Sequence, residues 1–564
     1  MGTLDWVVIG IFFLALIGII VWVVKQKQND SADYFLGGRD ATWLAIGASI
    51  FASNIGSEHL IGLAGAGASS GMAMAHWEIQ GWMILILGWV FVPFYSRSMV
   101  YTMPEFLERR YNPQSRTILS VISLISYVLT KVAVTVYAGG LVFQQVFGIK
   151  ELWGIDFFWI AAIGLVVLTA LYTIFGGMKS VLYTSVLQTP ILLLGSLIIL
   201  VLGFKELGGW DEMMSICSAV TVNEYGDTMT QLIRNNNDPN FPWLGALVGS
   251  AIIGFWYWCT DQFIVQRVLS GKNEKEARRG TIFGAYLKLL PVFLFLIPGM
   301  IAFALHQKYI GAGGEGFLPL LANGTANADA AFPTLVAKLL PAGVKGLVVC
   351  GILAALMSSL ASLFNSSAML FTIDFYKRFK PETPEKKLVG IGQIATVVIV
   401  ILGILWIPIM RSVGDVLYTY LQDVQSVLAP GIAAAFLLGI CWKRTSAKGG
   451  MWGLISGMII GLTRLGAKVY YSNAAVTDSS MFKYLFYDLN WLFFCGWMFL
   501  FCIIVVIAVS LMTEAPSAEK IQGLVFGTST PEQKAATRAS WNHWDIIHTV
   551  IILAITAAFY WYFW

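Results

Sequence analysis

The sequence predicts an all-helical integral membrane protein with about fourteen transmembrane helices. Composition is the first observation: 57% of the 564 residues are hydrophobic, 12% are charged, and the mean hydropathy is +0.72. Soluble domains carry about 25% charged residues, so lipid must solvate most of this chain. The second observation is a series of apolar runs near the 20 residues that a helix needs to cross a bilayer. These runs are too long for the strands of a membrane barrel, and they do not alternate.

The expected spans follow one another with polar or charged loops between them. They lie near residues 5–24, 41–66, 72–96, 117–147, 154–176, 181–203, 242–266, 281–305, 343–374, 388–410, 412–441, 448–470, 487–512 and 544–564. Lys and Arg gather in alternate loops, such as "QRVLSGKNEKEARRG" and "YKRFKPETPEKK". The positive-inside rule predicts that these loops are cytoplasmic and that both termini are extracytoplasmic.

Several classes of function are disfavoured by composition. The net charge of +4 is small and scattered, which disfavours a nucleic-acid partner. No loop is long enough for a soluble catalytic domain, and no GxxxxGK[ST] loop for a nucleotide is present. The six cysteines and five histidines show no metal-ligand or nucleophile spacing. We therefore expect that the protein is not an enzyme.

The span near 41–66 contains "SNIGSEH", which is poorly suited to a continuous helix. Asn54 and Gly56 are both poor helix formers, so the sequence predicts an unwound turn at membrane depth. Unwound backbone is tolerated there only where it lines a cavity, and secondary transporters use such interruptions to build ion and substrate sites. The alternative is an intact helix whose glycines serve close packing.

Ionisable side chains within other spans also indicate a buried functional site. Each costs about 2.5–3.5 kcal/mol at the bilayer centre, so its presence there needs a reason. Glu78 and Lys288 each lie inside an apolar run, where they face a cavity or each other unless they snorkel to the headgroups. The aromatic cluster "FWYWCTDQFIVQR", residues 255–267, suits stacking against a sugar or forms an aromatic belt. Within it, we interpret Asp261 and Arg267 as a structural pair.

A row of small polar residues lies in "AALMSSLASLFNSS", residues 354–367. Ala355, Ser358 and Ser359 stand at i, i+3 and i+4 and so share one helix face. Hydroxyls together with freed carbonyls form an oxygen cage for a hard monovalent cation, although Ser in membrane helices also serves packing. A broken helix, two ionisable groups and this serine face together indicate a transporter.

Several long motifs of this sequence resemble those of a known transporter family. "FASNIGSEHLIGLAGAGASSG", "TMPEFLERRY", "YWCTDQFIVQRVLS", "LMSSLASLFNSSAMLFTIDFY" and "APGIAAAFLLGICWKR" resemble the sodium/solute symporter family, and within it the sodium/glucose cotransporter branch. The likeness runs from about residue 5 to beyond residue 460. It implies an inverted-repeat core of five plus five helices, the leucine-transporter-like fold. The expected regions are an extra helix and loop (1–40), a first repeat (41–203), an extracellular loop (204–241), a second repeat (242–441) and extra C-terminal helices (442–564).

The resemblance also implies site residues. The sodium site would use the carbonyls of Ala52, Ile55 and Ala355 with the hydroxyls of Ser358 and Ser359. The sugar site would use Asn54, His59, Glu78, Tyr257, Trp258, Lys288 and Gln422, with Tyr257 as the inner gate and Gly254 leaving space beside one hydroxyl. Ser185 and Ala361 replace the carboxylate and hydroxyl of a second sodium site, which predicts one sodium per sugar.

The resemblance therefore predicts sodium-coupled symport of a glucose- or galactose-like hexose by alternating access. Its partners would be sodium as the cotransported ion, a small sugar and the lipid bilayer, with no oligomer required. Three alternatives stay open: a transporter of myo-inositol or another polyol, a sugar-gated sensor or channel, and proton coupling. The short loops suggest a bacterial inner membrane.

Overall fold

The structure of the chain is a computed structural model that describes residues 1–26, 30–56, 58–321, 324–411, 417–471 and 479–564. Helices make up most of these residues. The one sheet in the described part is a small hairpin, in which β1 (Glu151–Leu152) pairs antiparallel with β2 (Ile155–Asp156). The predicted all-helical class is confirmed.

The helices fall into those within apolar spans and those that join the spans. The first group is α1 (Thr3–Val24), α3 (Trp43–Asn54), α4 (Ala64–Ser70), α5 (Ala75–Glu78), α6 (Gly81–Ile86), α7 (Val92–Ser98), α9 (Pro113–Ser126), α10 (Ala133–Phe147), α11 (Phe157–Leu207), α13 (Trp243–Gly254), α14 (Gln262–Leu269), α15 (Glu274–Lys288), α16 (Ile297–Gly311), α18 (Val344–Met369), α20 (Glu385–Arg411), α21 (Leu417–Cys441), α22 (Ala447–Tyr471), α24 (Trp491–Met512) and α27 (His543–Tyr562). The second group is α2 (Ser31–Leu36), α8 (Met103–Arg110), α12 (Trp210–Ser218), α17 (Ala331–Leu339), α19 (Lys377–Phe379), α23 (Met481–Lys483), α25 (Ala518–Ile521) and α26 (Pro531–Ala539).

Eleven helical stretches of the described residues are long and apolar enough to cross a bilayer, and two shorter apolar helices accompany them. One stretch, α11, has 51 residues. At 1.5 Å per residue it would be far longer than a bilayer of about 30 Å. Gly177 interrupts α11 with φ 53° and ψ −148°, so the stretch comprises two of the expected spans. The exact count of fourteen stays a prediction.

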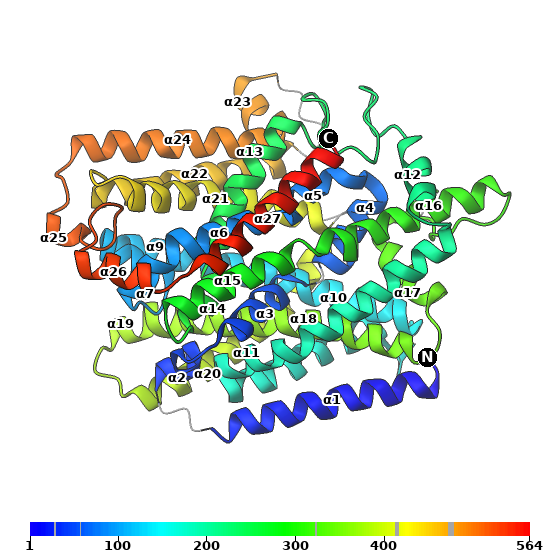
Figure 1. Cartoon of the computed structure of the whole chain (residues 1–564), viewed down its shortest axis with the longest axis horizontal. Helices are drawn as coiled ribbons and strands as arrows, with labels where there is room; N and C mark the ends of the chain where they lie inside the picture. The colour runs from blue at the N-terminus through cyan, green and yellow to red at the C-terminus, as the bar shows by residue number, and fades with distance from the viewer. Residues whose placement is uncertain (27–29, 57, 322–323, 412–416, 472–478) are drawn as a thin grey trace.

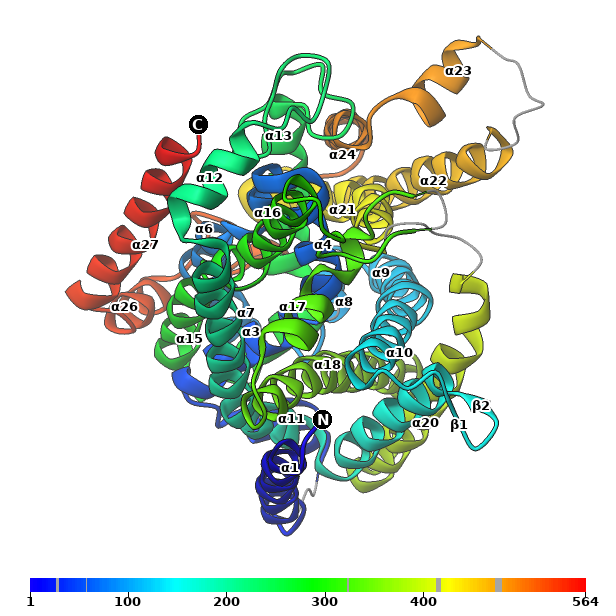
Figure 2. The same ribbon diagram turned by 90° about the vertical axis from the view of Figure 1, so that its right-hand side faces the viewer.

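The long helices run in roughly one direction across Figure 1, and Figure 2 looks along them. In Figure 2, α1, α22, α24 and α27 lie at the periphery around a centre that contains α3, α4 and α18. The peripheral helices expose large apolar side chains, such as Leu14 (71%), Ile504 (62%) and Trp561 (81%), as expected for surfaces that face lipid. By contrast, α18 is buried along most of its length.

Two helices are broken where the sequence predicts it. The helix α3 ends at Asn54, Ile55 is extended (ψ 106°), and a wide helical turn over Glu58–Leu63 leads into α4. Likewise α13 continues as a wide turn over Phe255–Thr260, Asp261 is extended (ψ 128°), and α14 follows. Both breaks are buried, which places freed backbone groups inside the bundle.

Backbone-to-backbone packing fixes the half-helix after the first break. A methyl group added at Gly299 of α16 would overlap the backbone carbonyl of Ala64, and one added at Gly67 of α4 would overlap that of Leu296. Such glycine contacts let membrane helices approach closely. They hold α4 against α16.

Candidate functional site

The serine face of α18 meets the first break. Ser53 Oγ, at the end of α3, lies 2.6 Å from Ser362 Oγ on α18. Ser362 is three and four residues beyond Ser359 and Ser358, so all three hydroxyls share one face of the helix. Ser358 and Ser359 are only 1% and 2% exposed. The structure therefore brings the predicted hydroxyls to the end of the broken helix.

The carbonyl residues of the predicted sodium site belong to the same buried region. Ala52 and Ile55 flank the end of α3, and Ala355 lies one turn before the serines on α18. All three are at most 1% exposed. Carbonyls in the last turn of a helix lack intrahelical donors, so the break at Ile55 leaves oxygens available to an ion. Carbonyl and hydroxyl oxygens fit a hard monovalent cation, and the assignment of sodium to them stays a prediction.

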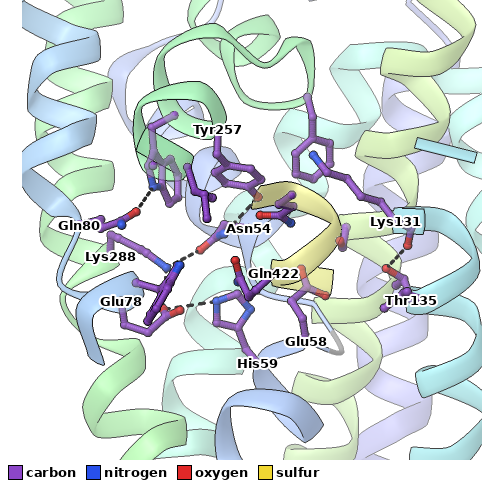
Figure 3. A pocket seen from close by; sticks show the side chains of 18 of the residues that line it. Asn54, Glu58, His59, Glu78, Gln80, Lys131, Thr135, Tyr257, Lys288 and Gln422 are labelled. Carbon is purple, nitrogen blue, oxygen red and sulfur yellow. Dashed lines mark hydrogen bonds and ion pairs between the residues drawn. The ribbon is translucent and has the colours of Figure 1, made fainter. Parts of the chain in front are cut away.

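All seven predicted sugar residues line one cavity, together with Ser359 (Figure 3). They come from α3, the wide turn after the first break, the wide turn before the second break, α5, α15 and α21, namely Asn54, His59, Glu78, Tyr257, Trp258, Lys288 and Gln422. The cavity measures about 60 Å³. Since one water molecule needs at least 10–15 Å³ of such space, the cavity holds a few waters in this form, and a hexose requires the helices to part.

Lys288 organises one wall of the cavity. Its Nζ donates to Glu78 Oε2 at 2.6 Å and to Asn54 Oδ1 at 3.1 Å, and it lies 5.3 Å from the centre of the Trp258 ring. Asn54 Nδ2 in turn donates to the Tyr257 hydroxyl at 3.1 Å. Figure 3 shows this chain of contacts crossing from α15 through both broken helices. Of the partners expected for Lys288, the structure shows Glu78.

Several polar atoms of the cavity are buried but make no hydrogen bond to a described residue. They are both ring nitrogens of His59, Gln422 Oε1 and Trp77 Nε1. His59 Nε2 lies 3.3 Å from Glu78 Oε2, which is an ion-pair distance when the ring is protonated. A buried donor or acceptor without a partner costs about 1–3 kcal/mol, so these atoms favour a ligand that supplies hydroxyl groups.

The second break carries a buried ion pair that the sequence analysis missed. Lys131 Nζ lies 2.5 Å from Asp261 Oδ2, and Tyr127 donates its hydroxyl hydrogen to Asp261 Oδ1. Arg267 forms no ion pair within 4 Å with Asp261 among the described residues, so the expected pairing of these two is wrong. The signal was available, because Lys131 is a lone lysine within the apolar run 117–147. We expected Arg267 as the partner because it is only six residues from Asp261 in the sequence. Distance along the chain does not show which helices pack against each other, so it could not indicate Lys131.

The space beside Gly254, which was expected to face a sugar hydroxyl, is filled by a protein side chain. A Cβ added there would meet Gln80 Oε1 at 2.6 Å, so the Gln80 amide fills the space predicted for a sugar hydroxyl. Gln80 Nε2 donates to the Ser250 carbonyl at 2.8 Å, and Trp258 Nε1 donates to Gln80 Oε1 at 3.2 Å. Gln80 therefore orients Trp258 in the cavity wall.

Other lining residues lay outside the predicted set. They are Glu58, Trp77, Lys131, Val134, Thr135, Ile253, Phe263, Leu363 and Gln425, with Gln80 and Gly254 described above. Glu58 and Trp77 are sequence neighbours of predicted residues, so their position in the same motifs was a usable signal. Thr135 and Gln425 carried no such signal, because a hydroxyl or amide on a membrane helix usually serves packing.

Comparisons with known proteins agree with this arrangement. The family model of the sodium:solute symporter family matches residues 34–457. The sodium/myo-inositol cotransporter 2 of Homo sapiens is 38% identical over 538 residues, which cover 93% of this chain and 79% of the human protein. The sodium/glucose cotransporter 4 of Mus musculus is 36% identical over 540 residues, covering 93% and 78% of the two chains.

One solved structure shares the fold over most of its length. It is a substrate-bound, outward-open Na⁺-coupled sialic acid symporter, with a TM-score of 0.73 and 22% sequence identity. The match covers 92% of this chain and 99% of the solved one. At this identity the likeness concerns the fold, and it agrees with the broken-helix architecture described above.

Proposed function

This chain belongs to the sodium:solute symporter family, and from that premise we propose that it carries a neutral hexose or cyclic polyol across the membrane together with sodium. Its relatives are transporters, and transport of this kind involves no covalent chemistry. The observation that carries the proposal is the cavity itself. It gathers paired charges, an aromatic wall and buried polar atoms that lack partners, which is the environment that a polyhydroxylated neutral molecule satisfies.

In this mechanism sodium binds between the end of α3 and the serine face of α18. Its binding orders Ile55 and Asn54, so the sugar finds its contacts already positioned. The conformational entropy that is lost when sodium binds does not have to be lost again when the sugar binds, and this couples the two binding events. Separation of the broken helices from α18 on the cytoplasmic side then releases sodium, and the sugar follows past Tyr257.

A stoichiometry of one sodium per sugar is part of the proposal. Ser185 Oγ donates to the Val181 carbonyl at 2.6 Å and lies 3.3 Å from Ser358 Oγ. Ala361 offers no side-chain oxygen on the neighbouring turn. A second cation would therefore meet neither a carboxylate nor a free set of hydroxyls at this position.

Hexose and polyol remain equal candidates for the substrate, because relatives of both kinds match with similar identity. Galactose, glucose and myo-inositol all present rings of hydroxyls to the same donors and acceptors. The proposal requires no oligomer, since the residues that line the cavity can all come from one chain.

Both termini are proposed to be extracytoplasmic. Figure 1 places the N-terminus and C-terminus at the right-hand ends of α1 and α27, whereas α2, α19, α25 and α26 lie toward the left. The Lys- and Arg-rich loops belong to that left-hand end, and basic loops favour the cytoplasm. The bacterial inner membrane rests on the short loops alone and stays a prediction, since the curated relatives named here are mammalian.

The test is uptake of labelled glucose, galactose and myo-inositol into proteoliposomes, with an inward sodium gradient or with choline at the same pH. We expect uptake of at least one of them that requires sodium. Gln422→Ala should raise its KM roughly ten-fold, because one hydrogen bond is lost. Gln522→Ala is the matched control, since Gln522 is exposed outside the cavity.

Uptake that ignores sodium at fixed pH would refute the coupling. A sodium current stimulated by sugar without sugar uptake would indicate a sensor or channel instead. Uptake driven by a proton gradient in choline would indicate proton coupling.

A further inference from the structure

The proposed mechanism gives no role to the acidic residue Glu58 of the cavity. Glu58 is the first residue of the wide turn that follows the break in α3, and it lines the cavity with Asn54, His59 and Gln422. Figure 3 shows it beside Gln422, on the side of His59 away from Glu78. The cavity thus has a carboxylate on each side of His59.

The carboxylate of Glu58 turns back over the break. A Cβ added at Gly56 would come within 2.5 Å of Glu58 Oε2, so the absence of a side chain at Gly56 makes this position possible. The conformation keeps the carboxylate at the cavity wall and away from lipid.

The other charges of the cavity are neutralised in pairs. Glu78 is paired with Lys288 at 2.6 Å, and Lys131 is paired with Asp261 at 2.5 Å. Glu58 forms no ion pair within 4 Å with any residue that the structure describes. Lys131 and His59 act on its charge through space, but no described residue holds the carboxylate in an ion pair, so it stays open to a ligand in this cavity.

We propose that Glu58 is a second substrate-contacting carboxylate, which accepts hydrogen bonds from hydroxyls of the ligand and makes the site reject anionic sugars. The inference rests on the proposed function and assigns its preference for neutral substrates to one side chain. Carboxylates accept paired hydrogen bonds from hydroxyl groups. A carboxylate on the ligand would instead be repelled by the like charge of Glu58, and this repulsion is strong at low dielectric. A uronic acid differs from its hexose mainly by that charge, so the pair isolates the effect.

A structural role for Glu58 makes a different prediction. An acidic residue in the first turn of a helix interacts favourably with the helix dipole, and here it would stabilise the half-helix that continues into α4. Glutamine keeps a hydrogen-bond acceptor at that place. A purely structural role therefore changes folding or uptake of all substrates together, and leaves the preference between neutral and anionic sugars unchanged.

The experiment measures sodium-driven uptake of the neutral substrate by the wild type and Glu58→Gln, with glucuronate and unlabelled neutral sugar as competitors. For the wild type we expect glucuronate to compete at least ten-fold more weakly than the neutral sugar. In Glu58→Gln the KM for the neutral substrate should rise roughly ten-fold, and glucuronate should gain about ten-fold or more as a competitor. Glu224→Gln, on an exposed loop, is the control for removing one charge from the chain.

Glu58→Asp keeps the charge and covers the case in which Glu58→Gln does not fold. It should bind the neutral substrate more weakly and still exclude glucuronate. A folded Glu58→Gln with an unchanged ratio of competition, or a wild type that accepts glucuronate as readily as the neutral sugar, overturns the inference. A wild type that transports none of the neutral substrates in sodium overturns the proposed function itself, which is a distinguishable result.

Discussion

The ion pair between Lys131 and Asp261 supports the second broken helix beneath Tyr257. Its two side chains are 8% and 2% exposed, so neither charge is well hydrated. Removal of one partner from a buried pair typically costs about 3–5 kcal/mol, because the other charge stays buried alone. Lys131→Met should have the larger effect. Asp261→Asn should cost less, because Lys131 would keep aromatic neighbours such as Phe263, whose ring centre is 4.8 Å away.

A double-mutant cycle separates the pair from its surroundings. Lys131→Met with Asp261→Asn removes both charges and keeps an acceptor for the Tyr127 hydroxyl. We expect the double variant to be more stable than the sum of the single effects predicts, with a coupling of about 2–4 kcal/mol.

The assay is thermal unfolding of the purified protein in one detergent at fixed concentration. An unfolding entropy of about 2.1 cal/mol/K per residue gives about 1.2 kcal/mol/K for all 564 residues, so each kcal/mol corresponds to about 1 °C. Lys131→Met should therefore lower Tm by about 3–5 °C, and the double variant by clearly less than the two shifts together. Single shifts that add within about 0.5 °C would show that the two side chains do not stabilise each other, and would refute the reasoning.

Three further predictions follow from other parts of the molecule. Ser359→Ala should raise the sodium concentration needed for half-maximal uptake roughly ten-fold, since one hydroxyl ligand is lost. Ser218→Ala, on the exposed end of α12, is the control and should leave that concentration unchanged. Equal sodium dependence of uptake in the wild type and Ser359→Ala would exclude Ser359 as a ligand. Gly299→Ala should reduce folded protein on size-exclusion chromatography, because its methyl group overlaps the backbone of α4, whereas Gly164→Ala has open space in α11 and should be tolerated. Burial raises the pKa of Asp329, in the loop before α17, to about 6. The folded state therefore favours its protonated form, and this contribution to stability is lost as pH rises from about 4 to 6. At pH 7 Asp329→Asn should be about 1–3 kcal/mol more stable than the wild type, a difference that vanishes near pH 4; a pH-independent difference in Tm would contradict this.

Much of the site could be predicted from the sequence because its signals are local. Asn54 and Gly56 weaken a helix wherever they occur, and the structure breaks α3 at that place. Ser358 and Ser359 share a face because helical periodicity requires it, and that face meets the break. The cost of a charge in lipid identified Glu78 and Lys288 before any contact between them was known.

The partners of these residues were decided by the tertiary structure. Lys288 reaches Glu78 across 210 positions of the chain, and Asp261 reaches Lys131 across 130 positions, although an arginine stands six residues away. The space beside Gly254 is filled by Gln80 from another helix. Hydropathy and helix propensity act on neighbouring residues, so the sequence by itself determined where the chain spans, breaks and carries charge. Which charges are neutralised depends on how the helices pack around a common cavity, and that packing places Glu58 in the cavity wall.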